Sequence, residues 1–214
     1  MNRRLYLLAA IFAVLAVPAL AVDMRLAALF SEHGQHGLPR DLAKLISLSE
    51  VIGHGLGVAC IVLTVVVLDR ANRRRVLRLL ACAFGAGLLS NLIKINLARY
   101  RPRTMQFQSV WDTFAGWCPW ATQGWQGIKN HDIQSFPSSH VATAAGLAVG
   151  LSWLYPQGRW LFAFFVVLAA VQRWQCDAHF ASDTLAAAAL GCLVAGFCLA
   201  PRGLGKWFDR WEAA

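Results

Sequence analysis

Charged residues are scarce in this sequence. Aspartate, glutamate, lysine and arginine make up 14% of the 214 residues, whereas 57% are hydrophobic and the mean hydropathy is +0.49. This composition is typical of a membrane protein, and it leaves no stretch polar enough for a separate soluble domain. The sequence also has no internal repeat and no low-complexity segment. We therefore expect a single integral membrane domain over residues 1–214.

Cysteine is too dispersed for a disulfide framework. Four of the six cysteines fall within apolar stretches and are expected to be small packing residues: Cys60, Cys82, Cys192 and Cys198. The other two, Cys118 and Cys176, fall in segments that we expect outside the cytoplasm, where disulfides persist. The sequence leaves open whether these two form a bond.

The charge that is present is mostly positive. Twenty lysines and arginines against eleven acidic residues give a net charge of +9. Such an excess can indicate nucleic-acid binding, but here the basic residues lie between apolar runs instead of on one polar face. Lipid headgroups, a phosphate substrate and the orientation of the chain explain them better. We expect membrane lipids and no nucleic acid among the partners, and the oligomeric state is not indicated.

Long apolar runs divide the chain into candidate transmembrane helices. A run of about 20 apolar residues crosses the ~30 Å hydrocarbon core. Six stretches approach this length: 5–22, 46–68, 76–98, 137–156, 160–171 with its flanks, and 181–199. The first stretch also resembles a secretory signal that is cleaved after Ala19-Leu20-Ala21. We expect an all-α polytopic bundle of about six transmembrane helices, or five if residues 1–22 are removed.

The basic residues between the apolar runs predict the orientation of the chain. Segment 69–78 carries five arginines and indicates a cytoplasmic loop, because positive charge accumulates on the cytoplasmic side. Segments 23–42 and 103–134 then lie outside. We expect a protein of the bacterial inner membrane, with its three polar motifs facing the periplasm or exterior.

The long connection over 103–134 is rich in aromatic side chains. It holds four tryptophans: Trp111, Trp117, Trp120 and Trp125. Tryptophan suits the headgroup region, where an apolar ring meets a polar edge. Two interpretations stay open, an interfacial anchor and a lid or entrance that admits a lipid sideways.

The first polar motif is Lys94 followed by Arg101-Pro102. The two cations are seven residues apart, or two helical turns, so they face the same way if the helix continues to Pro102. A lysine this deep in an apolar run is costly in lipid, so we expect it to face a polar cavity in the bundle. The alternative is an interfacial lysine whose amine reaches the headgroups. The presence of Arg101 favours the functional interpretation.

The second motif, Pro137-Ser138-Ser139-His140, begins the fourth apolar run. Its pattern is typical of a turn followed by the N-terminus of a helix. Such an end presents free backbone N–H groups and the positive pole of the helix dipole to an anion. Ser138 and Ser139 are therefore candidate contacts for a phosphate.

The third motif comprises Arg173, His179 and Asp183. Because Asp183 follows His179 by four residues, the two side chains would stack on one face of a helix. A carboxylate in that position can hold one imidazole nitrogen protonated and leave the other free as a nucleophile or base. Arg173 offers a fixed fork of donors for a phosphate.

Together these motifs resemble the type-2 phosphatidic acid phosphatase superfamily, which includes lipid phosphate phosphatases and the vanadium haloperoxidases. The family pattern is Lys-x6-Arg-Pro, then Pro-Ser-Gly-His, then Ser-Arg-x5-His-x3-Asp, and all three spacings match. Ser139 departs from the pattern by replacing the glycine, which keeps the N–H but loses the freedom of the backbone. Gln172 replaces the serine before Arg173, so its amide either rebuilds the hydroxyl contact or leaves it missing.

The resemblance implies a role for each matching residue. His179 would be the nucleophile that forms a phosphohistidine, Asp183 would orient it, and His140 would protonate the leaving oxygen. The phosphate would be held by Lys94, Arg101, Ser138, Ser139 and Arg173. Because three cations and helix N–H groups can neutralise the phosphate oxygens, we expect no metal and no cofactor. His33 and His36 do not change this expectation, since no cysteine or carboxylate cluster accompanies them.

We therefore expect a metal-independent membrane phosphatase that hydrolyses a lipid phosphate or pyrophosphate at the outer face. One alternative is a phosphotransferase of the same fold, which passes the phosphate to another lipid. Another is a non-catalytic lipid-binding protein. A pure binder would need the cations but not His140, His179 and Asp183, which argues against the last alternative. The sequence does not indicate which lipid is used.

Overall fold

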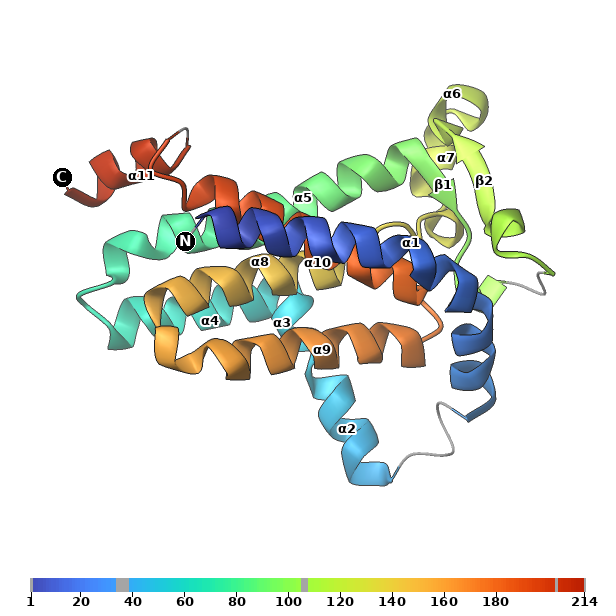
Figure 1. Cartoon of the computed structure of the whole chain (residues 1–214), viewed down its shortest axis with the longest axis horizontal. Coiled ribbons are helices and arrows are strands. Elements are labelled where there is room, and N and C mark those ends of the chain that lie inside the picture. The colour runs from blue at the N-terminus through green and yellow to red at the C-terminus, as the bar shows by residue number, and fades with distance from the viewer. Residues whose placement is uncertain (1, 34–38, 105–107, 203, 214) are drawn as a thin grey trace.

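The computed structural model describes residues 2–33, 39–104, 108–202 and 204–213, and most of them are helical. The long helices form one bundle (Figure 1), which confirms the expected all-α class. Its main helices are α1 (Asn2–His33), α2 (Arg40–Leu48), α3 (Glu50–Gly53), α4 (Gly55–Leu68), α5 (Val76–Asn96), α8 (Ser139–Leu154), α9 (Arg159–Gln175), α10 (Ala181–Cys198) and α11 (Leu204–Ala213).

Helix α8 lies at the centre of the bundle. It packs against α5, α9 and α10, and α1 runs along the outside of α10. Two glycines allow the close approach. A Cβ atom on Gly146 would lie 2.2 Å from the carbonyl oxygen of Cys82, and one on Gly191 would lie 2.5 Å from Cβ of Ala145. Small residues at these crossings therefore set the position of the central helix.

The described helices only partly match the expected transmembrane spans. Three of them are long and apolar enough to cross a membrane: Arg3–Ser31, Arg73–Asn96 and Ala181–Cys198. The second expected span is broken, because Arg40–Gly53 and Gly55–Leu68 meet at an angle of 75°, and this pair counts as a fourth span only if taken as one. The total of about six stays a prediction. Helix α1 passes through the candidate cleavage site at 19–21 without a break.

Large apolar side chains cover the outside of the bundle. Val14 of α1, Leu56 and Val67 of α4 and Val167 of α9 are all exposed. An apolar surface of this extent is compatible with a surrounding bilayer.

The two ends of the bundle differ in what they carry (Figure 1). At one end, Arg78 of α5 pairs with Asp209 at 2.6 Å and with Glu212 at 2.9 Å, so the C-terminal helix α11 is fastened to the bundle by its acidic residues. At the other end, α5 and α9 finish while α8 and α10 begin. The three motifs lie at these four helix ends.

The connection over 103–134 is more ordered than a plain loop. Strand β1 (Leu97–Arg99) pairs antiparallel with β2 (Phe114–Trp117), and the short helices α6 (Pro119–Gln123) and α7 (Trp125–Lys129) follow. The condition that the α5 helix continues to Pro102 is not met, because β1 begins directly after Asn96. Trp111, Trp117, Trp120 and Trp125 are all exposed, which suits an anchor and a lid equally.

A fully buried arginine joins α1, β1 and α10. The two terminal nitrogens of Arg99 donate to Asp23 Oδ2 at 2.8 Å, to Asp183 Oδ1 at 2.5 Å and to Ser182 Oγ at 2.8 Å. Asp23 also accepts from the backbone N–H of Ser182 at 2.9 Å. Segment 23–42, whose outer position stays a prediction, does not begin as a loop, because α1 continues to His33 and Asp23 has no exposed surface.

Replacing Arg99 should strongly destabilise the fold. In Arg99→Ala the carboxylates of Asp23 and Asp183 lose their shared cation, and removing one partner of a buried ion pair costs about 3–5 kcal/mol. Arg103→Ala is the matched control, since Arg103 donates to Asp132 at 2.9 Å but both side chains are about half exposed. Pairs of this kind contribute about 0–1 kcal/mol. Thermal unfolding in detergent measures both, and equal losses would contradict the role of Arg99.

Candidate active site

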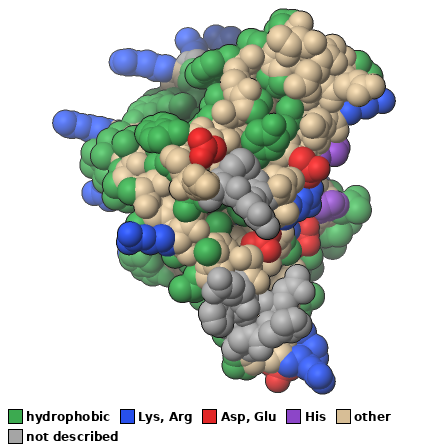
Figure 2. All heavy atoms as spheres, turned by 90° about the vertical axis from the view of Figure 1, so that its right-hand side faces the viewer, with side chains coloured by type: hydrophobic (Ala, Val, Ile, Leu, Met, Phe, Trp, Pro, Cys, Tyr) green, Lys and Arg blue, Asp and Glu red, His purple; other side chains and the backbone are tan. Residues whose placement is uncertain are grey.

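The structure brings the three motifs to one end of the bundle. Lys94 lies close enough to Arg101 and Arg173 for their charges to interact, and His140 likewise interacts with His179. Figure 2 looks onto this end of the molecule, where acidic, basic and histidine side chains gather towards one side. Residues from four helix ends therefore share one site.

Lys94 faces the interior of the bundle. Its side chain is buried, and Nζ donates to Ser139 Oγ at 3.2 Å, so it is not an interfacial lysine that reaches outward. Arg101 reaches the same region from the segment after β1, and its backbone N–H donates to the carbonyl oxygen of Asp132 at 2.9 Å. The seven-residue spacing is therefore spanned by a helix end and a strand, not by two helical turns.

The N-terminus of α8 offers donors that are not in use. Ser138 is the N-cap residue and is fully buried, yet its hydroxyl has no hydrogen-bond partner among the described residues. The buried Nε of Arg101 likewise has none. An unsatisfied buried polar group costs about 1–3 kcal/mol. Two such groups beside a helix N-terminus indicate a place for an anion.

Arg173 is held by residues on both sides. Its Nε donates to Oε1 of Gln172, so the amide that replaces the family's serine does contact the arginine. Its Nη2 pairs with Oε1 of Glu50, which lies on α3, at 2.9 Å. Nε of the guanidinium is thus fixed by Gln172, while Nη2 is occupied by the carboxylate of Glu50.

His179 lies in the turn before α10 and not on the helix, so the expected stacking on one helical face is wrong. Its Nδ1 lies 2.7 Å from the carbonyl oxygen of Ser135 and 3.8 Å from Asp183 Oδ2. Because a carbonyl oxygen only accepts, Nδ1 carries the proton and Nε2 keeps its lone pair. Burial lowers the pKa of His179 to about 4, against the opposing effect of Asp183.

Asp183 acts mainly on the loops around His179. Its carboxylate accepts from Ser135 Oγ at 2.6 Å and from the backbone N–H of Phe180 at 2.8 Å, besides the contact with Arg99. The first two contacts hold the residue that accepts from His179 and the residue that follows it. Asp183 therefore orients the imidazole chiefly through its supports.

His140 stands in the first turn of α8 beside an open space. Its Nε2 lies 3.8 Å from Glu50 Oε1, and its ring centroid lies 6.3 Å from that of His54. A cavity of 540 Å³ opens next to it, and Phe84 and Leu88 of α5 form part of its wall. His54 itself has a local role, because its Nδ1 accepts from the N–H of Leu56 at the start of α4.

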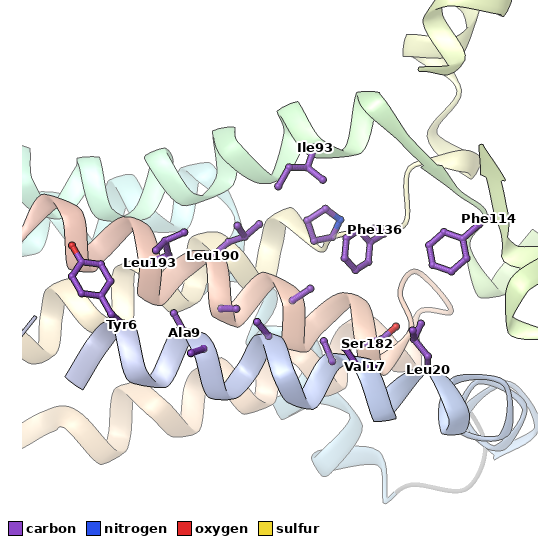
Figure 3. A pocket seen from close by; sticks show the side chains of 16 residues that line it. Tyr6, Ala9, Val17, Leu20, Ile93, Phe114, Phe136, Ser182, Leu190 and Leu193 are labelled. Carbon is purple, nitrogen blue, oxygen red and sulfur yellow. The ribbon is translucent and has the colours of Figure 1, made fainter. Parts of the chain in front are cut away.

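A second cavity, of 630 Å³, lies between α1, α5 and α10 (Figure 3). Ala9, Val17, Leu190 and Leu193 are among its lining residues, and the lining includes no cation. Ser182, the sequence neighbour of Asp183, also lines this cavity, and Figure 3 shows it near Val17 and Leu20. This cavity is therefore suited to apolar groups and not to a phosphate.

The two outer cysteines carry free thiols in the structure. Sγ of Cys118 lies 3.7 Å from Oδ1 of Asn96, and Sγ of Cys176 lies 3.3 Å from Nε2 of Gln172. The disulfide that the sequence left open is thus not formed. Of His33 and His36, the two histidines considered as metal ligands, His36 lies outside the described residues.

Sequence reasoning missed four residues of this region: Asp23, Glu50, Arg99 and Ser135. A signal was present for three of them. Arg99 precedes the motif cation Arg101 by two residues, and an acidic residue at the edge of an apolar run, such as Asp23 or Glu50, needs a partner. Ser135 gives its backbone carbonyl to His179 and its hydroxyl to Asp183, and nothing in the sequence indicated either contact.

A family model described as the PAP2 superfamily matches residues 75–203, which is more than half of the chain. The matched range contains all three motifs. Neither a search of curated proteins nor a search of solved structures found a match. The spacing of the motifs, their convergence at one end of the bundle and the family match agree, and the chain belongs to the PAP2 superfamily, which implies phosphatase activity on phosphate esters.

Proposed function

We propose that this protein is a membrane-embedded phosphatase that hydrolyses a lipid phosphate or pyrophosphate through a phosphohistidine on His179. The observation that carries the proposal is the position of the imidazole. Nδ1 is tied to the carbonyl of Ser135, so the lone pair of Nε2 is free beside a cluster of cations. A neutral, oriented imidazole in such a place is equipped to attack phosphorus.

The cations and the α8 N-terminus support binding of the phosphate. Lys94, Arg101 and Arg173 are positioned to neutralise the oxygens that gain charge in the transition state. The unpaired donors, Ser138 Oγ and Arg101 Nε, would complete the contacts. Because the chain supplies these donors itself, the proposed reaction uses no metal ion.

The proposed reaction has two steps. Nε2 of His179 attacks phosphorus while the bond from phosphorus to the leaving oxygen breaks, and His140 gives that oxygen its proton. Water then attacks the phosphohistidine, His140 takes the proton from the water, and inorganic phosphate leaves. The same residue thus serves as acid and then as base.

The space beside His140 favours a lipid leaving group. The 540 Å³ cavity adjoins the residue that would protonate the leaving oxygen, and apolar side chains of α5 line part of it. The exposed apolar surface of the bundle supports placement in a bilayer. Exposed arginines at the opposite end, namely Arg70, Arg73, Arg74 and Arg159, support an outer position for the site.

A lipid-to-lipid phosphotransferase would use the same first step. The second step would then need an acceptor lipid in place of water. Release of inorganic phosphate from one lipid phosphate in detergent, without any other lipid, separates the two reactions, and we expect release.

Replacing His179 should abolish turnover. In His179→Ala no nucleophile remains, and we expect the rate to fall at least on the order of 10³-fold. Labelled substrate, quenched in acid-free denaturant, should leave phosphoenzyme in the wild type and none in this variant. His131→Ala, which changes an exposed histidine, is the control and should label normally. Wild-type turnover by His179→Ala would contradict the mechanism.

The activity should fall only at low pH on the acid limb of the pH profile. His179 attacks only when neutral, and its pKa is lowered from 6.5 to about 4 by burial, so it stays neutral well below pH 6. We expect kcat/KM to fall with a midpoint near pH 4 as the pH decreases. The protein should regain full activity when returned to pH 7, which controls for unfolding. A midpoint near pH 6.5 on a substrate whose phosphate does not titrate there would contradict the lowered pKa expected for His179.

Chelation should leave the activity unchanged. The positive charges that neutralise the phosphate come from Lys94, Arg101 and Arg173, so excess chelator has no metal ion to remove. Vanadate should inhibit, because it adopts the trigonal-bipyramidal geometry of the transition state. Phosphate release with and without chelator measures the effect. Activity that is lost in chelator and restored by magnesium or zinc would refute metal independence.

A further inference from the structure

Glu50 places a carboxylate inside the cluster of cations. It is the first residue of α3, directly after the break that ends α2, and its Oε1 lies 2.9 Å from Arg173 Nη2 and 3.8 Å from His140 Nε2. The side chain is 45% exposed, so its position is not explained by burial in a core.

The other groups that face His140 oppose a positive charge on its ring. They are Arg173 from α9, Lys94 from α5, and His179 and His54 from the adjoining turns. Among the described residues, Glu50 supplies the carboxylate that comes within 4 Å of this imidazole. A general acid must be protonated before it can act, and an opposite charge nearby favours the protonated form.

The backbone keeps Glu50 close to His140. A Cβ atom on Gly53, at the end of α3, would lie 2.6 Å from the carbonyl oxygen of His140. Helix α3 therefore packs directly on the first turn of α8. This contact joins the carboxylate and the imidazole independently of their charges.

We propose that Glu50 is the positioning residue of the general acid His140, pairing with Arg173 in the empty site and with His140 when a phosphate occupies Arg173. This inference rests on the proposed function and identifies a residue outside the family's motifs. Glu50 stays a carboxylate throughout, since the proton passes from His140 to the leaving oxygen and, in the second step, from the attacking water to His140.

Charge repulsion provides the reason for the exchange. Two charges of the same sign about 4 Å apart repel each other substantially at the effective dielectric constant near a protein surface. A phosphate on Arg173 therefore pushes the carboxylate away. A movement of about 1 Å takes Glu50 from 3.8 Å to hydrogen-bonding distance from His140. Substrate binding thus favours the protonated form of His140, which takes its proton from solvent, when the acid is needed.

The test compares two leaving groups. An alkyl lipid phosphate, phosphatidate in detergent, has a poor leaving group that needs a proton, whereas p-nitrophenyl phosphate does not. We expect Glu50→Gln to lower kcat on phosphatidate on the order of 10²-fold, the range of general acid catalysis, while p-nitrophenyl phosphate changes by less than about 3-fold. His140→Ala should show the same selectivity. Glu50→Asp, which keeps the charge, should recover part of the loss.

The pH profile gives a second readout. In Glu50→Gln the basic limb of kcat on phosphatidate should move by about one unit to lower pH, because His140 loses its proton more readily. Glu50→Asp should keep the limb of the wild type. Asp41→Asn is the control, since Asp41 is an exposed acidic residue of the neighbouring α2 that pairs only with Lys44, at 3.8 Å, among the described residues. It should change neither readout.

Several outcomes would overturn the inference. Equal losses on both substrates would assign Glu50 a structural role, and unchanged rates on both would assign it none. If Glu50→Gln lowered KM for both substrates and left the basic limb of the pH profile unmoved, Glu50 would only compete with phosphate for Arg173. Wild-type protein that releases no phosphate from either substrate would instead defeat the proposed function.

Discussion

The rest of the site depends on the ion pairs that the guanidinium of Arg99 forms. It has no exposed surface, and it neutralises Asp183 and Asp23 at once. With its charge balanced, Asp183 holds Ser135 and the backbone of Phe180, and Ser135 in turn orients His179. Through Ser135, Asp183 and Arg99, the proposed nucleophile is thus four contacts away from Asp23 of α1. Orientation of one imidazole involves the N-terminal helix, the strand after α5 and the start of α10.

Around this support the site combines rigid and adjustable parts. Lys94 and Ser139 hold each other across the ends of α5 and α8, and Gln172 fixes one side of Arg173. By contrast, the other side of Arg173 is paired with a half-exposed carboxylate on a four-residue helix between two breaks. The proposed nucleophile is therefore placed by buried contacts, whereas the surroundings of the proposed acid respond to the ligand.

Much of the fold class and the site location follows from the sequence, because hydropathy and motif spacing report directly on helices and their ends. The structure of the segments that connect the helices does not follow from the sequence. The spacing of Lys94 and Arg101 suggested a continuous helix, yet the pairing of β1 with a strand from the tryptophan-rich segment decided otherwise. The spacing of His179 and Asp183 suggested one helical face, yet Asp183 caps the helix and His179 precedes it. In both cases tertiary contacts override a local periodicity.

Two acidic residues of the site, Asp23 and Glu50, come from a different part of the chain than the basic ones. The matched family range, residues 75–203, contains Lys94, Arg99, Arg101 and Arg173, whereas Asp23 and Glu50 precede it. The three motifs are therefore not a transferable module. If residues 75–203 were grafted onto another scaffold, Arg99 would keep one of its two carboxylates and Arg173 would lose its own. The N-terminal third of the chain thus supplies negative charges that balance arginines of the remaining part. A substitution of a charged residue in one part therefore limits which substitutions the other part tolerates.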